Sequence, residues 1–452
     1  MKIFSRTGVA LASLLFGLTA VTMSAAQTTP AARPPMPQIQ LPEFSNGQRA
    51  IDLLGARLPE VAAHYRKTPG EFAANLRRDR TARLDRQGRL FHVEEFVVPQ
   101  GATTAGAAAT PGTTASYPLD QTFLLHSRPG ASKVIYLDFN GHSTTGTAWN
   151  SSYGITTIVS PAFDLDGIPS SFSTTELERI QKIWQRVAED YAMFDVDVTT
   201  QEPPADVLQR TASTDNVYGV RAVITRDFTT TTASPCGCGG FAYVGVFDYV
   251  GENYKPAFIF FDKLGSGNEK YVAEAVSHEV GHTLGLSHDG TSTTSYYRGQ
   301  GSGATGWAPI MGVGYYQPLV QWSRGEYTDA NNREDDIAII QANGLTLRAD
   351  DHGNTTAAAT AMTGTSANGM VSYWGQGVVE SAADVDVFSF VSGAGAVTIS
   401  VVPAMLALNL DIIAEVRNAA GSVIGTSNLL GAQNASFSLS LPASGTYFVT
   451  VR

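Results

Sequence analysis

The chain has 452 residues, of which 43% are hydrophobic and 16% are charged, so it is long enough for several domains and too poor in charge for a coiled coil or a charge-rich tail. Its formal net charge of −11 argues against nucleic acid as the main partner. With only two cysteines, a disulfide framework cannot hold the fold together.

The N-terminus has the three-part layout of a secretory signal peptide. Lys2 and Arg6 precede an apolar run at residues 9–20, and small residues follow up to Ala26. The run is shorter than the roughly 20 residues that span a bilayer. We therefore predict a signal peptide over residues 1–26, cleavage after Ala26 and secretion of the protein. No later stretch is long enough for a membrane span, so none is expected.

Residues 27–116 are predicted to be a propeptide that ends in a flexible linker. Weak helical patterning is followed by a strand-like run at 89–98, and residues 101–116 are almost only Gly, Ala, Thr and Pro. This part holds 11 Lys and Arg against 8 Asp and Glu, whereas the rest of the chain is acidic. A basic segment and an acidic body could attract each other, as a detachable inhibitory segment and its enzyme would.

Residues 117–346 are predicted to form an α/β or α+β domain, because strand and helix patterns interleave. Ser173-Thr-Thr-Glu176 is a capping box that opens an amphipathic helix. Ser266-Gly-Asn-Glu269 is predicted to open a second helix that runs into residues 278–284. A short helix is expected at 333–342, after Asn332. Strands are expected at 133–139, 217–225, 240–247 and 257–261.

One motif carries the chemistry and reads His278-Glu-Val-Gly-His-Thr-Leu-Gly-Leu-Ser-His288. On a helix, His278 and His282 lie one turn apart on the same face, so both imidazoles can reach one metal ion. Gly285 can take a positive φ at the helix end and turn the chain, which brings back His288 as a third ligand. Three imidazoles leave a fourth position for water, as a catalytic zinc site requires. Glu279, on the adjacent face, can reach that water as a general base.

The extended motif resembles that of the metzincin zinc endopeptidases. Their second mark is a methionine-containing turn beneath the metal, and Ala308-Pro-Ile-Met311-Gly312 matches it. Asp289, directly after the third His, resembles the pattern of the reprolysin-like (adamalysin-like) branch. The resemblance covers about residues 130–345 and implies a mixed five-stranded sheet, two long helices and a cleft between two subdomains. Some metzincins have a Tyr two residues after the turn Met. Position 313 is Val here, which leaves open whether Tyr315 or Tyr316 assists catalysis.

A secreted zinc-dependent endopeptidase made as a zymogen is therefore predicted, with one catalytic zinc ion and a protein or peptide substrate. We expect the substrate to lie extended against an edge strand at 240–245. The propeptide is expected to cover the cleft non-covalently, and Glu94, Glu95 or His92 are candidates to reach the zinc. Two alternatives remain: a zinc hydrolase of a non-peptide amide or ester, with a small closed cleft, and a binding protein or adhesin on a metzincin scaffold.

Acidic pairs and the two cysteines are further candidate sites. Asp164-Leu-Asp166 and Asp195-Val-Asp197 are candidates for calcium, because secreted enzymes often bind it through oxygen-rich loops. Cys236-Gly-Cys238 could close a small strained disulfide ring or remain two thiols.

Residues 347–452 are predicted to form an all-β sandwich, because short alternating runs are broken by turn residues. The stretches 384–390 and 445–451 resemble the bacterial pre-peptidase C-terminal domain, which implies a role in attachment, secretion or maturation. The sequence ends at Arg452 directly after a strand-like run, so the sandwich could lack its last strands.

Overall fold

The computed structural model describes residues 2–6, 33–95, 116–228 and 237–452. Contacts divide them into two compact units. One consists of residues 33–348 with 404–409, and the other consists of 349–403 and 410–452 with the start of the chain. Most of the predicted signal peptide and most of the predicted linker lie outside the described residues.

An eight-stranded mixed sheet forms the centre of the first unit, with the order β2-β3-β4-β10-β11-β9-β5-β8. Strands β8, β5, β9 and β11 run parallel, whereas β10 is antiparallel to β11 and β4 is antiparallel to β10. The bounds are β2 Ser45–Asn46, β3 Ala82–Leu84, β4 Leu90–Val93, β5 Lys133–Asp138, β8 Asp197–Thr199, β9 Tyr218–Thr225, β10 Gly240–Tyr243 and β11 Ala257–Phe260.

The sheet is larger than the five strands that the metzincin resemblance implies. Residues 133–260 supply five strands, and the remaining three come from residues 33–95, called the N-terminal segment below. The physical reason is that β10 would otherwise be an edge strand with unpaired backbone groups, and β4 pairs with it. Residues 96–98 of the predicted strand at 89–98 lie outside the described residues, and within 89–95 the strand covers Leu90–Val93.

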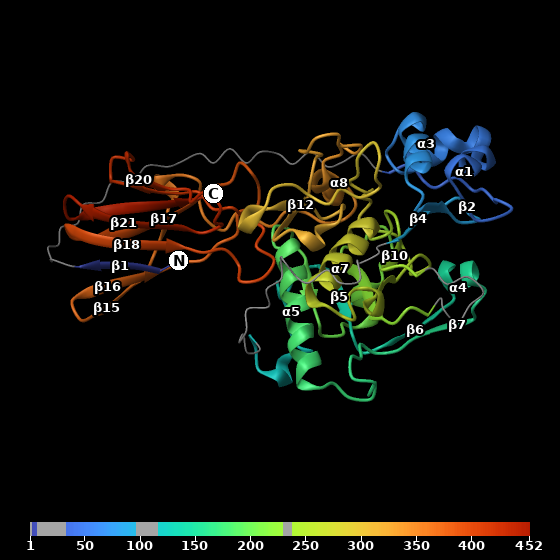
Figure 1. Ribbon diagram of the computed structural model, residues 1–452, viewed down its shortest axis with the longest axis horizontal. Helices are drawn as coiled ribbons and strands as arrows, with labels where there is room; N and C mark the ends of the chain where they lie inside the picture. Colours follow the sequence, from blue (N-terminus) through green and yellow to red (C-terminus); the bar gives the residue numbers. More distant parts are fainter. Residues whose placement is uncertain (1, 7–32, 96–115, 229–236) are drawn as a thin grey trace. The chain divides into compact units, whose positions relative to one another are not determined.

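Two long helices, α5 (Thr174–Asp190) and α7 (Glu269–Thr283), pack together against one face of the sheet (Figure 1). The capping box at Ser173 and Glu176 is confirmed. The second predicted capping box is wrong. Ser266 has φ of +53°, and Asn268 is the N-cap, because its side chain accepts hydrogen bonds from the backbone N–H groups of Lys270 and Tyr271.

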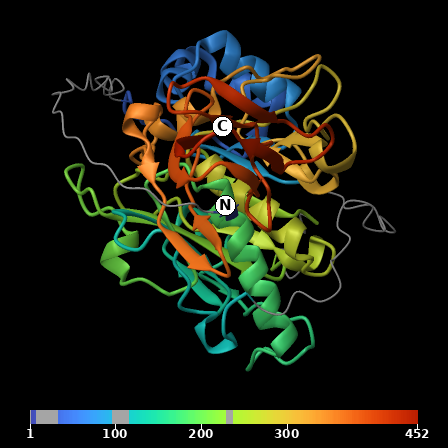
Figure 2. The ribbon, with the colours of Figure 1, turned by 90° about the vertical axis from the view of Figure 1, so that its left-hand side faces the viewer.

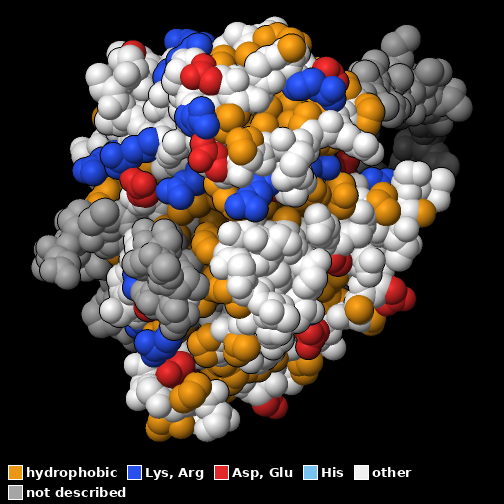
Figure 3. Space-filling model, turned by 90° about the vertical axis from the view of Figure 1, so that its right-hand side faces the viewer, with side chains coloured by type: hydrophobic (Ala, Val, Ile, Leu, Met, Phe, Trp, Pro, Cys, Tyr) orange, Lys and Arg blue, Asp and Glu red, His pale blue; other side chains and the backbone are white. Residues whose placement is uncertain are grey.

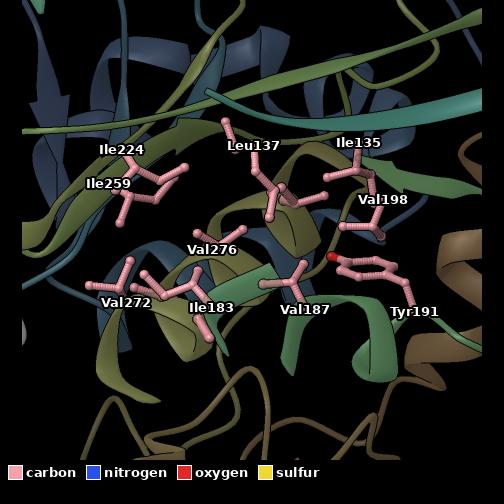
Figure 4. Close-up of a cluster of buried hydrophobic side chains, with 14 of the residues drawn as sticks. Ile135, Leu137, Ile183, Val187, Tyr191, Val198, Ile224, Ile259, Val272 and Val276 are labelled. Carbon is pink, nitrogen blue, oxygen red and sulfur yellow. The ribbon is translucent and has the colours of Figure 1, made fainter. Parts of the chain in front are cut away.

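Apolar side chains from the sheet and these two helices interlock in the main core (Figure 4). Every one of them is almost completely excluded from water. The side chains labelled in the figure are Ile135, Leu137, Val198, Ile224 and Ile259 from the strands and Ile183, Val187, Tyr191, Val272 and Val276 from the helical side. This packing fixes α7, which carries the motif, against the sheet.

The opposite face of the sheet is covered by aromatic residues and by α4 (Ala148–Tyr153), which lies between the hairpin strands β6 (His142–Thr145) and β7 (Thr157–Ser160). A shorter helix than expected, α8 (Asp336–Ala342), follows later in the chain. Its N-cap is Asp335 rather than Asn332, because the Asp335 side chain accepts a hydrogen bond from the N–H of Ala338. The remaining short elements are α6 (Ala205–Leu208) and the parallel pair β12 (Trp307–Pro309) and β13 (Leu319–Gln321).

The N-terminal segment has three short helices: α1 (Gly47–Leu54), α2 (Leu58–His64) and α3 (Pro69–Arg78). They lie together, away from α5 (Figure 2, blue and green). Their apolar side chains form a separate cluster with those of β3 and β4 and with Val244. The segment is therefore a folded module with its own core, joined to the rest of the sheet through the pairing of β4 with β10.

Residues 349–403 and 410–452 form two five-stranded sheets around one apolar core, as predicted for an all-β region. The sheet orders are β15-β16-β1-β18-β21 and β14-β17-β22-β19-β20, and β1 (Lys2–Arg6) comes from the start of the chain. The other bounds are β14 Thr360–Ala361, β15 Gly364–Ala367, β16 Met370–Trp374, β17 Asp386–Ser392, β18 Gly395–Val401, β19 Ala414–Arg417, β20 Val423–Ser427, β21 Ala435–Leu441 and β22 Gly445–Val451. Among the described residues, none of the helices has the length and apolar character that a membrane crossing needs.

Candidate active site

The three motif histidines meet at the end of α7, as the spacing predicts. The centroids of the His278, His282 and His288 rings lie 4.8, 4.9 and 5.1 Å apart pairwise. All three side chains are buried. The Nε2 atoms of His282 and His288 are 3.1 Å apart. The arrangement is a nearly equilateral triangle of buried imidazoles.

Hydrogen bonds fix which ring nitrogen faces the centre. The Nδ1 of His278 donates to the carbonyl of Ile310 at 2.9 Å, and the Nδ1 of His282 donates to the carbonyl of Leu286 at 2.9 Å. Because carbonyls only accept, the protons of these two rings sit on Nδ1, and Nε2 presents a lone pair. Such second-layer contacts orient metal-ligating imidazoles.

Gly285 and Met311 have the supporting positions that the sequence predicts. Gly285 follows the helix with φ of +98°, and its N–H donates to the carbonyl of His282 at 2.8 Å. Met311 is fully buried, and a Cβ added to Gly281 would lie 2.7 Å from its Sδ. The N–H of Asp289 donates to the carbonyl of Met311 at 2.8 Å, so the turn holds the loop that carries His288.

Glu279 is completely buried beside these rings. Among the described residues, neither of its carboxylate oxygens has a hydrogen-bond partner. Burial raises its pKa well above the usual range, and the carboxylate of Glu94 raises that pKa further. A Cβ on Gly240 would collide with Oε1 of Glu279, so the glycine in β10 leaves room for the acid. An orphaned buried carboxylate at this place fits an acceptor for a reacting water.

Glu94, directly after β4, lies among the three imidazoles. Its Oε1 is 3.1 Å from the Nε2 of His282 and 3.0 Å from that of His288, and its Oε2 is 3.7 Å from the Nε2 of His278. Ligands of a tetrahedral zinc ion with bonds of about 2.0–2.1 Å are separated by about 3.3 Å. The carboxylate oxygens of Glu94 therefore lie at about the spacing of neighbouring zinc ligands from the Nε2 atoms of the three imidazoles.

The charges around the site also suit a cation. Burial would raise the pKa of Glu94, but His288, His278 and His282 hold it well below its usual range. Burial would lower the pKa of His288, but Asp79 and Glu94 raise it to about 10. Asp79 accepts a hydrogen bond from the Nδ1 of His288 at 2.6 Å. Two buried carboxylates thus stabilise positive charge between the imidazoles. A divalent metal ion would place a larger positive charge there than a protonated imidazole does.

The other two candidates of the N-terminal segment lie beside the site. The ring of His92 stacks on that of His282, with centroids 4.3 Å apart, and its Nδ1 is 3.2 Å from the hydroxyl of Thr81. The ligand atoms of His92, Glu94, His282 and His288 all lie within 4.8 Å of one another. Glu95 instead forms an ion pair with Arg80 at 2.9 Å, and 36% of its side chain is exposed.

Sequence reasoning missed Tyr296. Its hydroxyl donates to Oε2 of Glu94, and its ring lies 4.5 Å from that of His288. Tyr315 packs against Tyr271, and Arg298 lies over the ring of Tyr316. Asp79 and Gly240 were missed as well. No spacing rule links these residues to the motif, because the chain fold alone brings them together.

The calcium candidates are already engaged by protein groups. Asp195 pairs with Arg128 and Asp197 pairs with His126, each at 2.6 Å. The Oδ1 of Asp164 accepts two backbone N–H groups, although carboxylate oxygens of Asp164, Asp166 and Glu176 gather within 4.8 Å. These contacts do not support a calcium site, and calcium binding remains a prediction. Cys238 is disulfide-bonded, and Cys236, the other cysteine of the chain, lies outside the described residues.

Residues 178–289 match the family model of metallo-peptidase family M12B, reprolysin-like. The match begins in α5 and ends directly after His288. This part of the chain is therefore a reprolysin-like metzincin, and the protein is a zinc metalloendopeptidase. Neither the curated proteins nor the solved structures compared with the chain contain a match. The resemblance of the C-terminal region to the pre-peptidase domain stays a prediction.

Proposed function

We propose that the protein is a secreted zinc endopeptidase made in a latent form, in which the N-terminal segment fills the substrate cleft and Glu94 takes the fourth ligand position at the zinc. The carrying observation is the place of Glu94 among the three imidazoles, at the end of a strand that pairs with β10. Secretion is supported by the signal-like pattern of residues 1–26.

The motif residues divide the chemistry of peptide hydrolysis. When bound, zinc supplies a Lewis acid that makes water a nucleophile near neutral pH. His278, His282 and His288 would hold it through their Nε2 atoms. Glu279 would take the proton from the attacking water and deliver it to the leaving amine. The orphaned, buried state of its carboxylate supports this role over that of a structural acid.

The N-terminal segment occupies the edge on which we expect the substrate. Glu94 donates its N–H to the carbonyl of Gly240 at 3.0 Å, and Gly239 donates to the carbonyl of Glu94 at 2.8 Å. The N–H of Val244 donates to the carbonyl of Leu90 at 3.0 Å. An extended peptide adds to a sheet edge through the same groups. β4 and a substrate therefore compete for one place.

Ion pairs assist this docking but do not dominate it. Arg33 pairs with Asp248 at 2.7 Å, Lys67 pairs with Glu334, and Arg78 donates to the carbonyl of Asn331 at 3.0 Å. Figure 3 views the molecule from the right-hand side of Figure 1 and shows that Lys and Arg side chains gather in the upper half of that view. Strand pairing and buried contacts at the metal site carry the rest of the interface.

An open hollow adjoins the site. Its volume is about 560 Å³. Its lining includes Arg78 and Glu95 from the segment, and Tyr296, Val313 and Tyr316 from residues 116–348, called the catalytic part below. An open hollow lined by Glu95, the residue after Glu94, suits an extended chain better than a small amide or ester, which would fit a closed pocket. This geometry, with the family match, favours the peptidase over both alternatives.

The experiment uses the full chain with a cleavage site introduced between residues 101 and 116. Intact wild-type chain should hydrolyse a fluorogenic peptide slowly, and cleavage followed by dilution should release activity. Adding the separate 27–116 polypeptide should then restore inhibition. In that polypeptide, Glu94→Gln should raise the inhibition constant about 30-fold or more, because truncating one side of a buried charged contact costs at least about 2 kcal/mol.

Glu95→Gln is the matched control, since this neighbouring acid pairs with Arg80 at the surface and should change the inhibition constant little. Equal inhibition by the Glu94→Gln and Glu95→Gln polypeptides would contradict the role of Glu94. Absence of inhibition by the wild-type polypeptide at tens of micromolar would contradict latency itself.

A further inference from the structure

β4 shows how an extended chain lies in the cleft, because its backbone pairs with β10 over a defined register. Val93 lies opposite Phe241, His92 opposite Ala242, and Phe91 opposite Tyr243. Side chains alternate between the two faces of a strand. His92 and Glu94 point toward the face that carries α7 and its histidines, so Phe91 and Val93 point toward the aromatic face.

On that face, Phe91 inserts into a group of rings from the catalytic part, called the aromatic wall below and formed by Trp149, Phe241, Tyr243 and Tyr254. The ring of Phe91 lies 5.7 Å from Trp149 in an edge-to-face arrangement and 5.4 Å from Tyr243. Phe91 is buried, with 5% of its surface exposed. Edge-to-face contacts at these distances are favourable beyond simple burial.

The wall is a preformed surface of the catalytic part. Trp149 comes from α4, and its indole N–H donates to the carbonyl of Pro256 at 2.9 Å. Its ring lies 4.2 Å from that of Tyr243 and 4.6 Å from that of Phe241. Tyr254 packs on Tyr243 at 5.0 Å. These ring contacts join residues outside the N-terminal segment, so they can persist when the segment leaves. The hydroxyl of Tyr243 also donates to Oδ2 of Asp85 in the segment at 3.1 Å, and that bond would be lost.

The same face receives a cation from Arg89, which lies two residues before Phe91 and directly precedes β4. The guanidinium of Arg89 lies 4.5 Å from the ring centre of Tyr254 and 5.1 Å from that of Tyr249. Cations over tyrosine faces at such distances are attracted by the ring electrons. Arg89, Phe91 and Val93 thus present a basic, an aromatic and an aliphatic side chain at alternate positions.

We infer that the aromatic wall is a substrate subsite, and that the protease prefers extended peptides with an aromatic side chain three residues before the residue that lies at the zinc. A basic side chain two residues further upstream adds to this preference. The inference rests on the proposed function, because it treats β4 as a stand-in for the substrate strand.

The test measures kcat/KM of the activated full chain on fluorogenic peptides. The parent peptide repeats residues 88–93 and continues with neutral residues in place of Glu94 and Glu95. Replacing the counterpart of Phe91 by Ala should lower kcat/KM about 10- to 100-fold, the scale of a buried Phe side chain. Replacing it by Tyr should have little effect, and replacing the counterpart of Arg89 by Ala should cost about 2- to 5-fold.

The counterpart of Leu90 provides the matched control within the same peptides. Leu90 packs in the cluster of the N-terminal segment and not on the wall. Its replacement by Ala should change kcat/KM by less than about threefold. Mass spectrometry should place the cut within one residue of the position that replaces Glu94.

Two enzyme variants locate the preference. Trp149→Leu should shrink the ratio of kcat/KM for the Phe and Ala peptides, whereas Tyr243→Phe keeps the ring and should preserve that ratio. Melting temperatures check that both variants fold. If Trp149→Leu does not fold, the peptide series on the unchanged enzyme still tests the preference for an aromatic side chain. Equal cleavage of the Phe, Ala and Leu90-replaced peptides would overturn the inference alone. Failure to cleave any peptide would count against the proposed function.

Discussion

Strand β10 has two antiparallel neighbours, β11 and β4, and they differ in what they bury. Every residue of both neighbours is buried. Toward the helices, β11 presents Ile259, which belongs to the main core. On the same side of the sheet, β4 presents His92 and is followed by Glu94. One neighbour therefore packs like a core strand, and the other carries ionisable groups into the same layer.

The difference indicates the role of each strand. An apolar side chain such as Ile259 stabilises the sheet by burial alone. A buried carboxylate is costly unless a cation or several donors compensate it. In the described part of the chain, the carboxylate of Glu94 finds this compensation at the three motif histidines and at Tyr296. β4 is thus matched to the active site rather than to the core, which is the property expected of a strand that stands in for substrate.

The largest expected effect concerns Glu279, one of the two buried glutamates at the site. Glu279→Gln keeps the size of the side chain but cannot accept a proton, so kcat of the activated chain should fall about 10²- to 10⁴-fold with zinc retained. Metal analysis and peptide hydrolysis measure the two quantities. Hydrolysis by this variant at the wild-type rate would show that Glu279 is not the base.

Removing the third histidine should weaken the metal itself. In the His288→Ala chain, zinc affinity should fall more than about 100-fold, since loss of an outer contact alone typically costs 10- to 100-fold. Competition with a chromophoric chelator measures the affinity. Replacing His142, which lies on the β6 hairpin, by Ala is the control. Full zinc content in His288→Ala under competition would remove His288 from the ligand set.

A smaller effect tests how β10 makes room for the base. In Gly240→Ala the new methyl group would collide with Oε1 of Glu279 and would lie 2.6 Å from the carbonyl oxygen of Phe258, so the side chain of Glu279 or strand β10 would have to shift. Overpacking of this kind costs about 1–3 kcal/mol. We therefore expect a fall in kcat of about 10-fold or more with zinc content unchanged. An active variant with unaltered kcat would mean that Glu279 is not held where β10 places it.

The smallest effect concerns salt. The pair of Arg33 and Asp248 is partly exposed, with 14% and 26% of the side chains accessible. Such pairs contribute up to about 1 kcal/mol. Raising salt or introducing Asp248→Asn should weaken inhibition by the 27–116 polypeptide about fivefold at most. A loss of inhibition by several orders of magnitude would show that charge, rather than strand pairing, holds the segment.

Local patterns predicted the parts of the fold that depend on local rules. The helix from Ser173, the strands around Ile135 and Ile259, and the turn at Gly285 follow from capping, alternation and backbone preference. The start of α7 was misplaced, because Ser266 and Asn268 are both good N-caps and tertiary contacts decide between them.

The site was predicted to the extent that its residues are neighbours in sequence. Helical spacing brings His278 and His282 together, and a glycine turn returns His288. Tyr296 and Asp79 reach the site through long-range packing, which leaves no period or spacing to recognise. Glu94 was one of three candidates in the propeptide, and only the register of β4 on β10 distinguishes it from Glu95.

We propose that Glu94 occupies the fourth position at the metal in the intact chain. The most direct measurement is the visible absorption spectrum of the cobalt-substituted full chain during titration with acetohydroxamate, a small metal-binding probe. The intact wild-type chain and its Glu95→Ala variant should show no spectral change at millimolar probe, whereas Glu94→Ala should bind the probe with a clear shift of the cobalt bands. Equal binding of the probe by wild type and Glu94→Ala would show that Glu94 does not occupy this position.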